Sequence, residues 1–168
     1  DSDYRDIYGE HDIRVLNVSP GGNVYFIVAG YMNRGRHEGE SGVGLYHYDA
    51  SSGTVEEKLF VDTNRSYDLL RRDVEELAYI TEDQSSFYML LDGNIYQINL
   101  ATMEMTTLME GLKLGCVEGS ATGQHFAYLK ENEPYNSSTI SMMNLDTGEV
   151  KEITCAGSER IRMLGYLG

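Results

Sequence analysis

The residues that could perform catalysis are few, and their spacing matches no common catalytic motif. The stretch GESGVG (39–44) approaches the Gly-x-Ser-x-Gly turn that exposes a nucleophilic serine, but Val43 stands where the last glycine belongs. We therefore expect Ser41 to be an ordinary loop serine. The sequence has no phosphate-binding loop, zinc-protease helix or Cys-x-x-Cys pair. It accordingly predicts no catalytic residue in this chain.

The histidines and turn carboxylates also give no metal site. The four histidines, which are His11, His37, His47 and His125, share no ligand spacing. Calcium takes about six to eight oxygen ligands, whereas each of the turns DASSG and NLDTG supplies a single carboxylate. We predict no metal and no cofactor. Among the histidines, His37 is the candidate for ligand contact because it lies in a long polar loop.

A group of arginines stands out in a chain whose formal net charge is −14. Its members lie in two segments, 33–42 and 62–73, and are Arg34, Arg36, Arg65, Arg71 and Arg72. Such a cluster can clamp a carboxylate or a phosphate. The alternative is neutralisation by acids nearby, which are Asp62, Asp68, Asp73, Glu75 and Glu76. With His37, Tyr67 and Tyr135, these arginines form the candidate binding set.

The elements that position these residues follow from a repeat. Three similar turns, DASSGTV (49–55), NLATMEM (99–105) and NLDTGEV (144–150), each follow a β-rich run and precede another. Asn, Asp, Ser and Gly in such turns predict hairpins. In the second copy, Met103 stands where the turn glycine belongs.

A second pattern repeats ahead of the first. SPGGNVYFIV (19–28), TEDQSSFYML (81–90) and SATGQHFAYL (120–129) each run from Ser or Thr through a polar turn into an aromatic strand. In this alignment Tyr25, Phe87 and Phe126 occupy the same place. Another short apolar run precedes each copy, so one unit contains four strands. Repeated four-stranded antiparallel units of this length are typical of β-propeller blades.

The turn motif and the Ser-x-x-Gly-x-x-aromatic motif resemble the YVTN-type and related bacterial propeller repeats. The resemblance runs from about Ile13 to Gly168 and implies an all-β fold of propeller-like blades. We predict one propeller-like domain or propeller fragment over 1–168, with units at about 13–61, 74–109 and 112–155. The first strand of a fourth unit is expected at 160–168. Proteins with such blades include enzymes, peptide binders and surface sensors, so the resemblance implies no particular chemistry.

Three blades are fewer than the 4 to 8 that propellers typically contain. The chain could be part of a longer propeller, could associate with a copy of itself through open blade edges, or could form an open stack. The incomplete unit at 160–168 favours a longer propeller. No apolar run reaches the length of about 20 residues that a membrane span requires, so we predict no membrane insertion within this chain. The acidic charge also argues against a nucleic-acid partner.

Blade geometry predicts where a ligand would bind. The long segments 33–42, 62–73 and 130–138 should emerge on one face, opposite the short turns, and loops on a rigid scaffold commonly carry function. We expect a short helix within 65–77, capped by Ser66, with Leu69 and Leu70 turned inward.

The leading hypothesis is a non-enzymatic binding or sensory module of a larger bacterial extracytoplasmic protein, at the cell surface or secreted. It would recognise a peptide, a glycan or a partner protein. The alternative is the propeller portion of a hydrolase or other enzyme whose catalytic residues lie outside this chain. A purely structural spacer is a third possibility. A catalytic domain elsewhere in the full-length gene would favour the enzyme, whereas further blades with a lipoprotein signal or an anchor would favour the binding module.

Overall fold

The computed structural model describes residues 8–32, 36–63, 65–112, 117–119, 124–132 and 137–156. The chain divides into two compact units, residues 1–75 and 76–168. Each unit is built from four-stranded antiparallel sheets in which consecutive strands are neighbours. This confirms the predicted all-β fold of blade-like sheets, whereas a single domain over 1–168 stays a prediction. The strand expected at 160–168 lies outside the described residues.

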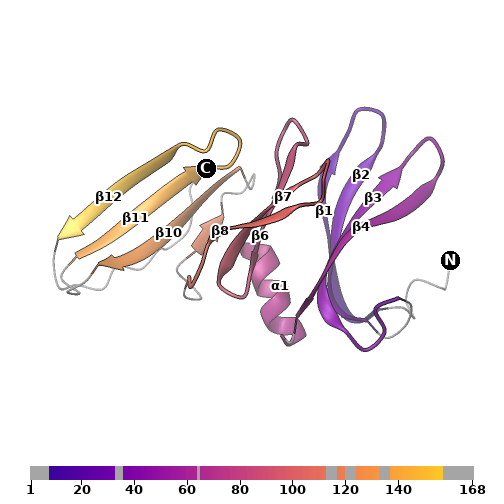
Figure 1. Cartoon of the computed structure of the whole chain (residues 1–168), viewed down its shortest axis with the longest axis horizontal. Coiled ribbons are helices and arrows are strands. Elements are labelled where there is room, and N and C mark those ends of the chain that lie inside the picture. Colours follow the sequence, from indigo (N-terminus) through magenta and orange to yellow (C-terminus); the bar gives the residue numbers. More distant parts are fainter. Residues whose placement is uncertain are drawn as a thin grey trace. The chain divides into compact units, whose positions relative to one another are not determined.

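The first unit holds one sheet and the helix (Figure 1). Its strands are β1 (Tyr8–Val18), β2 (Val24–Met32), β3 (Ser41–Asp49) and β4 (Thr54–Thr63), and the helix is α1 (Tyr67–Glu76). The helix starts directly after Ser66, as predicted. Leu70 is buried, but the expectation for Leu69 is wrong because its side chain is exposed. The reason is helical spacing: Leu70, Asp73 and Val74 form the buried stripe, and Leu69 falls beside it.

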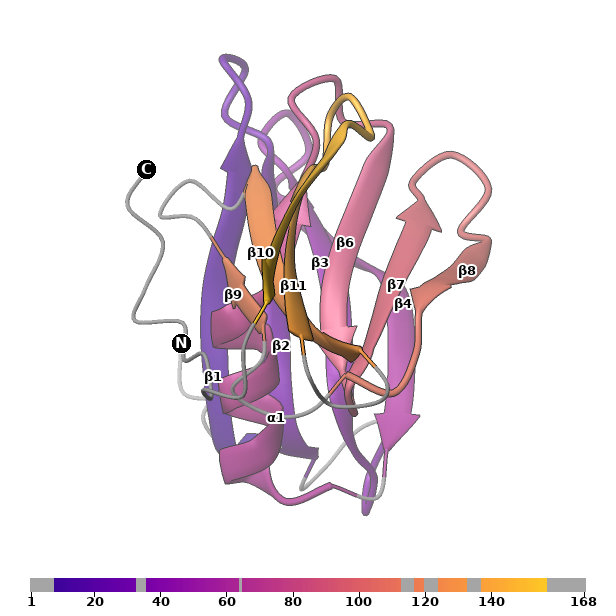
Figure 2. The same cartoon turned by 90° about the vertical axis from the view of Figure 1, so that its left-hand side faces the viewer.

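The second unit contains two sheets. One consists of β5 (Ala78–Ile80), β6 (Ser86–Leu91), β7 (Asn94–Asn99) and β8 (Met105–Met109), and Figure 2 shows β6, β7 and β8 side by side. The other consists of β9 (Val117–Gly119), β10 (His125–Asn132), β11 (Ser137–Asn144) and β12 (Val150–Ala156). Including the first unit, three sheets therefore lie close to the predicted ranges.

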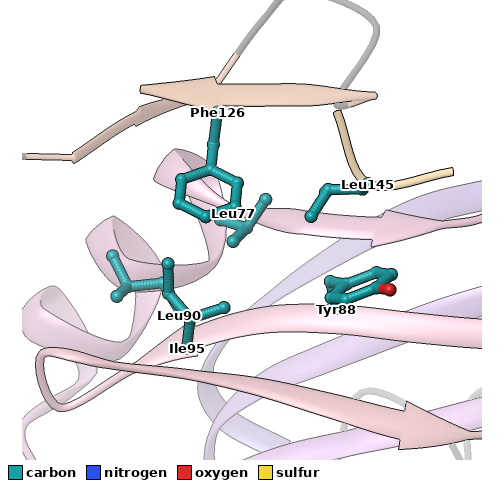
Figure 3. Packing of buried hydrophobic residues seen from close by; sticks show 6 residues of the cluster. All are labelled: Leu77, Tyr88, Leu90, Ile95, Phe126 and Leu145. Carbon is teal, nitrogen blue, oxygen red and sulfur yellow. The ribbon is translucent and has the colours of Figure 1, made fainter. Parts of the chain in front are cut away.

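The two sheets of the second unit pack through one apolar cluster (Figure 3). Phe126 of β10 reaches toward Leu77, Leu90 and Ile95, and Leu145 of the third NLDTG-type turn joins them. Phe126 and Ile95 are completely buried, and Tyr88 is nearly so. Burying such side chains contributes roughly 1.5–3 kcal/mol each, so this contact is a main source of stability for the unit.

The repeated turn has the same geometry in all three sheets. The backbone N–H of Gly53, Met103 and Gly148 donates to the carbonyl oxygen four residues earlier, at 2.8, 2.7 and 2.8 Å. All three residues have a positive φ, of 69°, 58° and 71°. Met103 therefore adopts the left-handed conformation that glycine adopts at low cost, which preserves the turn at the expense of local strain.

The register corrects one detail of the sequence alignment. The first turn of the first sheet is closed by Ser19 N–H to the carbonyl of Asn23, whereas the corresponding bond of the second sheet runs from Thr81 to Ser86. The first turn is thus one residue shorter. Consequently Val24, and not Tyr25, occupies the place of Phe87 and Phe126. The cross-strand partners agree: each is the residue directly before the repeated turn, namely Tyr48, Ile98 and Met143.

Candidate functional site

The two arginine-bearing segments leave the same end of the first sheet. Ser41, at the start of β3, is paired with Tyr31 near the end of β2 and with Thr63 at the end of β4. The Ser41 hydroxyl donates to the carbonyl oxygen of Arg65 at 2.8 Å, which fixes the segment before α1 against β3. The described parts of the two segments are therefore neighbours, as the blade geometry predicted.

The arginines nevertheless do not form an open cluster. Arg65 turns inward, with its Nη2 3.5 Å from the carboxylate of buried Asp73. On α1, Arg71 pairs with Glu75 at 3.7 Å, and Arg72 also has an interaction partner. Arg36 is 85% exposed and lies 3.9 Å from Glu57. A structural role explains Arg65 best, and binding of an anion by the others stays a prediction.

The other candidate binding residues, and Tyr31 near the end of β2, differ in their exposure. Tyr67 is the first residue of α1 and is half-buried. Tyr31, beside the long loop, is exposed. Arg34 and Tyr135 lie outside the described residues. The structure thus directs Arg36 and His37 toward the same carboxylate, that of Glu57, whereas Arg65 turns to Asp73.

His37 is held between two carboxylates. Its Nδ1 lies 2.7 Å from Oε2 of Glu40, and its Nε2 lies 3.0 Å from Oε1 of Glu57. The other oxygen of Glu57 accepts a hydrogen bond from the Tyr46 hydroxyl at 3.1 Å. The ring also stacks on Phe60, with centroids 3.8 Å apart and planes 15° apart. These contacts attach the 36–40 loop to one face of the sheet.

The electrostatics favour a charged ring. Burial of the ring disfavours the charge, but the hydrogen bonds that the ring donates to Glu57 and Glu40, and the negative charges of these carboxylates, outweigh it and raise the pKa of His37. A protonated imidazole with both N–H groups donating to carboxylates has no lone pair for general-base catalysis. The Ser41 hydroxyl donates to a backbone carbonyl rather than to this histidine. The geometry therefore suits fixation of the loop rather than acyl transfer.

Two glycines explain the Ser-Gly-Val-Gly stretch. A Cβ on Gly42 would overlap the backbone of β4 and lie 2.7 Å from Phe60 Cζ. A Cβ on Gly44 would lie 2.6 Å from the ring of Tyr46. Gly42 and Gly44 therefore make room for the Phe60 and Tyr46 rings to lie against the sheet. Their role is steric support of the His37 site.

These groups share one face of the first sheet, which we call the Val15 face. The cross-strand pairs join Val15, Phe26, Tyr46 and Glu57 in one row and Ile13, Val28, Gly44 and Phe60 in the next. On the opposite face, Arg14 Nη1 donates to the carbonyl oxygen of Val74 at 2.7 Å, so α1 lies alongside that face. The described part of the His37 loop, residues 36–40, lies on the β4 side of the Val15 face.

The β1 side of the Val15 face is exposed and apolar. Ile13, Val15 and Val18 are 55%, 58% and 61% exposed. In the second sheet, the positions equivalent to Val15 and Val18 are Ala78 and Ile80, which are 4% and 2% exposed. An exposed apolar row at positions that are buried elsewhere in the same chain indicates an interaction surface.

Sequence reasoning missed this surface because it treated the run IRVLNV only as the first strand of a blade. The signal that could have found it is the alternation of Ile13 and Val15 with polar residues, because alternate side chains of a strand share a face. It could not show that the face is exposed. Val55 on β4 is less informative. It is 42% exposed, and the equivalent residues of the other two sheets, Met105 and Val150, are 43% and 45% exposed.

Carboxylates in the turns bond to protein groups. Asp49 accepts from the backbone N–H and the hydroxyl of Ser51, at 2.8 and 2.7 Å. Asp146 accepts from the Tyr79 hydroxyl at 3.1 Å and from the Gln124 amide at 2.6 Å. Within the part of the chain that the structure describes, no group of three His, Cys, Asp or Glu is arranged to hold a metal ion. Nor does the described chain include a helix long and apolar enough to cross a membrane.

No family model and no curated protein matches this chain. Among solved structures, TolB from Acinetobacter baumannii is 16% identical, with a TM-score of 0.47 over 87% of this chain and 33% of its own. The β-propeller domain of the Trilobed protease from Pyrococcus furiosus is 9% identical, with a TM-score of 0.48 over 89% and 44%. An oligogalacturonate lyase in complex with manganese is 10% identical, with a TM-score of 0.41 over 88% and 49%.

The chain therefore spans between a third and a half of the length of these structures. At such identities the likeness concerns the fold alone. Its sheets, their consecutive antiparallel order and the repeated turns are those of propeller blades, and the chain is a propeller module. The assignment to YVTN-type repeats stays a prediction.

Proposed function

We propose that this chain is a non-enzymatic protein-binding module that packs its Val15 face against a partner protein. The observation that carries the proposal is the exposure of Val15 and Val18 at positions whose counterparts in the second sheet, Ala78 and Ile80, are buried. Exposed Ile13 extends the same row. Exposed apolar patches are costly in water, and covering this one recovers about 25 cal/mol for each Å² removed from solvent.

The chemistry of this face favours a protein over a glycan or a nucleic acid. Its exposed β1 edge is aliphatic, whereas a glycan would require polar groups and exposed aromatic rings. The aromatic rings at its centre pack on one another, with Phe26 and Tyr46 stacked at a centroid distance of 5.4 Å. An apolar sheet face flanked by polar groups resembles the core and rim of protein interfaces.

The His37 site supports this function by keeping the face rigid. Its contacts to Glu40, Glu57 and Phe60 hold the loop against the sheet before any partner binds. Prior ordering lowers the entropy that binding must overcome. The same contacts occupy both ring nitrogens of His37, which supports a non-enzymatic role.

The test is selection of binders from a displayed library of protein fragments, using the immobilised chain and a Val15→Glu variant in parallel. We expect recovered fragments to bind the unmodified chain and to lose most of their affinity for the variant. A Leu69→Glu variant is the matched control, because Leu69 is an exposed leucine on α1. Fragments that bind all three proteins equally would contradict the proposal.

We place this module in a larger bacterial extracytoplasmic protein, as the repeat resemblance implies. The full-length gene and fractionation of the producing cell test this context. Turnover of ester, glycoside or peptide substrates by the purified chain would contradict the non-enzymatic role. A catalytic domain elsewhere in the gene would instead make the chain the binding portion of an enzyme.

A further inference from the structure

We infer that the partner on the Val15 face is a second copy of this chain, joined head to tail so that two copies bring six blades together. The inference rests on the proposed function, because it names the occupant of the same face. It follows from comparing the sheet-to-sheet contact within the second unit with two further faces, one on the first sheet and one on the third, that carry exposed apolar side chains.

The contact within the second unit shows how two blades of this chain fit. The face of the third sheet that carries Phe126 packs on the face of the second sheet that carries Tyr88, Leu90 and Ile95. Figure 3 shows the Phe126 ring directed at these side chains. One face type therefore inserts an aromatic side chain, and the other type receives it on aliphatic residues.

The Val15 face corresponds in position to the inserting face, with Val24 where that face has its inserted aromatic ring. Val24 is the counterpart of Phe126, because each is paired with the residue directly before the repeated turn, Tyr48 or Met143. Phe26 likewise corresponds to Tyr128. The first sheet therefore presents, on its exposed side, the same positions that the third sheet uses to pack on the second.

The other face of the third sheet corresponds in position to the receiving face of the second sheet. Leu129 is paired with Ile140, and Ile140 with Ile153, as Leu90 is paired with Ile95 and Ile95 with Met109. We call this the Leu129 face. Leu129 and Ile140 are half-buried, and Ile153 is more than half exposed. Its aliphatic character matches the surface on which Phe126 already sits.

Joining these two faces reproduces a contact that the chain already makes. A head-to-tail contact forms a closed ring when the rotation allows, and two copies with three sheets each supply six blades, within the range of 4 to 8 found in propellers. Four strands of nine to eleven residues form a face of about 30 Å by 19 Å, from the usual rise and spacing of strands. The two contacts of a closed pair would then bury roughly 2,000 Å² in total, the area of a stable interface.

The experiment measures the mass of the purified chain by sedimentation equilibrium, together with three variants. Val15→Glu alters the Val15 face and Ile153→Glu alters the Leu129 face, whereas Met105→Glu is the control because Met105 is an exposed apolar residue on β8 of the second sheet. We expect the unmodified chain and the control to be dimers. Each interface variant should weaken the dimer by at least about 100-fold in Kd, because it buries an unpaired charge. Circular dichroism confirms that each variant is folded.

Mixing the two interface variants separates head-to-tail pairing from other arrangements. In the mixture, one of the two contacts joins an unaltered Val15 face to an unaltered Leu129 face, so we expect a mixed dimer to reappear with lower affinity. A monomeric unmodified chain, or a dimer that tolerates Val15→Glu, would overturn the inference. A dimer disrupted by Val15→Glu but not by Ile153→Glu would also overturn it, because it would show two Val15 faces in contact. A monomer that still selects Val15-dependent fragments would leave the proposed function standing.

Discussion

The first and third sheets have the same strand order and the same repeated turn, yet equivalent faces of the two have opposite surroundings. In the third sheet, Phe126 is completely buried in a cluster shared with the second sheet. In the first sheet, the equivalent face carries Val24 and is bordered by exposed Val15 and Val18. Polar contacts differ less between the two sheets. The Tyr46 hydroxyl donates a hydrogen bond to Glu57 at 3.1 Å, and at the equivalent place the Ser141 hydroxyl donates one to Glu152, also at 3.1 Å. The sequence pattern within a blade therefore determines how its strands pair, whereas the neighbouring blade determines which face of the sheet is buried.

The largest effect should come from removing the aromatic side chain that the third sheet has where the first sheet has Val24. Phe126→Ala should lower the free energy of unfolding by about 3–5 kcal/mol, because it leaves a cavity among Leu77, Leu90 and Ile95. Val24→Ala, at the equivalent place of the first sheet, should cost under about 1.5 kcal/mol in the monomer, since Val24 is half-buried. Chemical denaturation of both variants measures the difference. Equal costs would show that the two faces are equally well packed.

A second contrast lies within the first unit, between a buried ion pair and an exposed one. Asp73→Ala should cost about 3 kcal/mol, because it leaves the largely buried Arg65 guanidinium without the carboxylate at 3.5 Å. Arg36→Ala should change stability by less than about 0.5 kcal/mol, because its pair with Glu57 is exposed and screened. Thermal unfolding of the two variants makes the comparison. A large loss for Arg36→Ala would mean that the exposed pair supports the loop.

The His37 site predicts a dependence of stability on pH. Because the folded pKa of His37 is raised, its contribution is fully present below the unfolded pKa of about 6.5 and is lost as pH rises through the folded pKa. The unmodified chain should therefore exceed His37→Gln in stability by about 1–2 kcal/mol near pH 6, with a smaller margin at alkaline pH. Denaturation at a series of pH values measures this margin, and NMR titration of the His37 ring locates its pKa.

The groups facing the ring on the Val15 face are Glu40, Glu57 and the exposed Arg36. Replacing both glutamates by glutamine is the matched control, since the ring then loses the carboxylates that favour its charge. In that background the stability lost through His37→Gln should no longer grow toward low pH. If the unmodified chain exceeded His37→Gln in stability by the same amount at every pH, the ion pairs of His37 with the two glutamates would not contribute to stability.

Much of the fold could be predicted because it depends on local patterns. Turn residues such as Asn99, Asn144 and Gly148 define hairpins through bonds within a few residues, and alternation defines which side chains share a face. The candidate site was less predictable. His37 was considered for ligand contact because it lies in a long loop, and that stays a prediction. Its partner Glu57 is 20 residues away on another strand, so the local sequence could not show the pair. The inward turn of Arg65 depends on buried Asp73, and the exposure of Val15 depends on what lies beside the sheet.

The smallest effect concerns the one repeated turn that lacks glycine. Met103 has a φ of 58°, close to the 69° and 71° of Gly53 and Gly148, and donates the same hydrogen bond. A left-handed conformation costs a residue with a side chain about 1–2 kcal/mol, whereas glycine avoids this cost but loses more chain entropy on folding. Met103→Gly should therefore stabilise the chain by about 0.5–1 kcal/mol. The matched reverse change, Gly148→Ala, should destabilise it by about 1 kcal/mol, because a Cβ there meets open space and only the backbone strain remains. Thermal unfolding of both variants measures the two shifts, which should have opposite signs. A loss of stability in Met103→Gly would mean that contacts of the methionine side chain outweigh the strain, and the three turns would then be alike in geometry but not in what stabilises them.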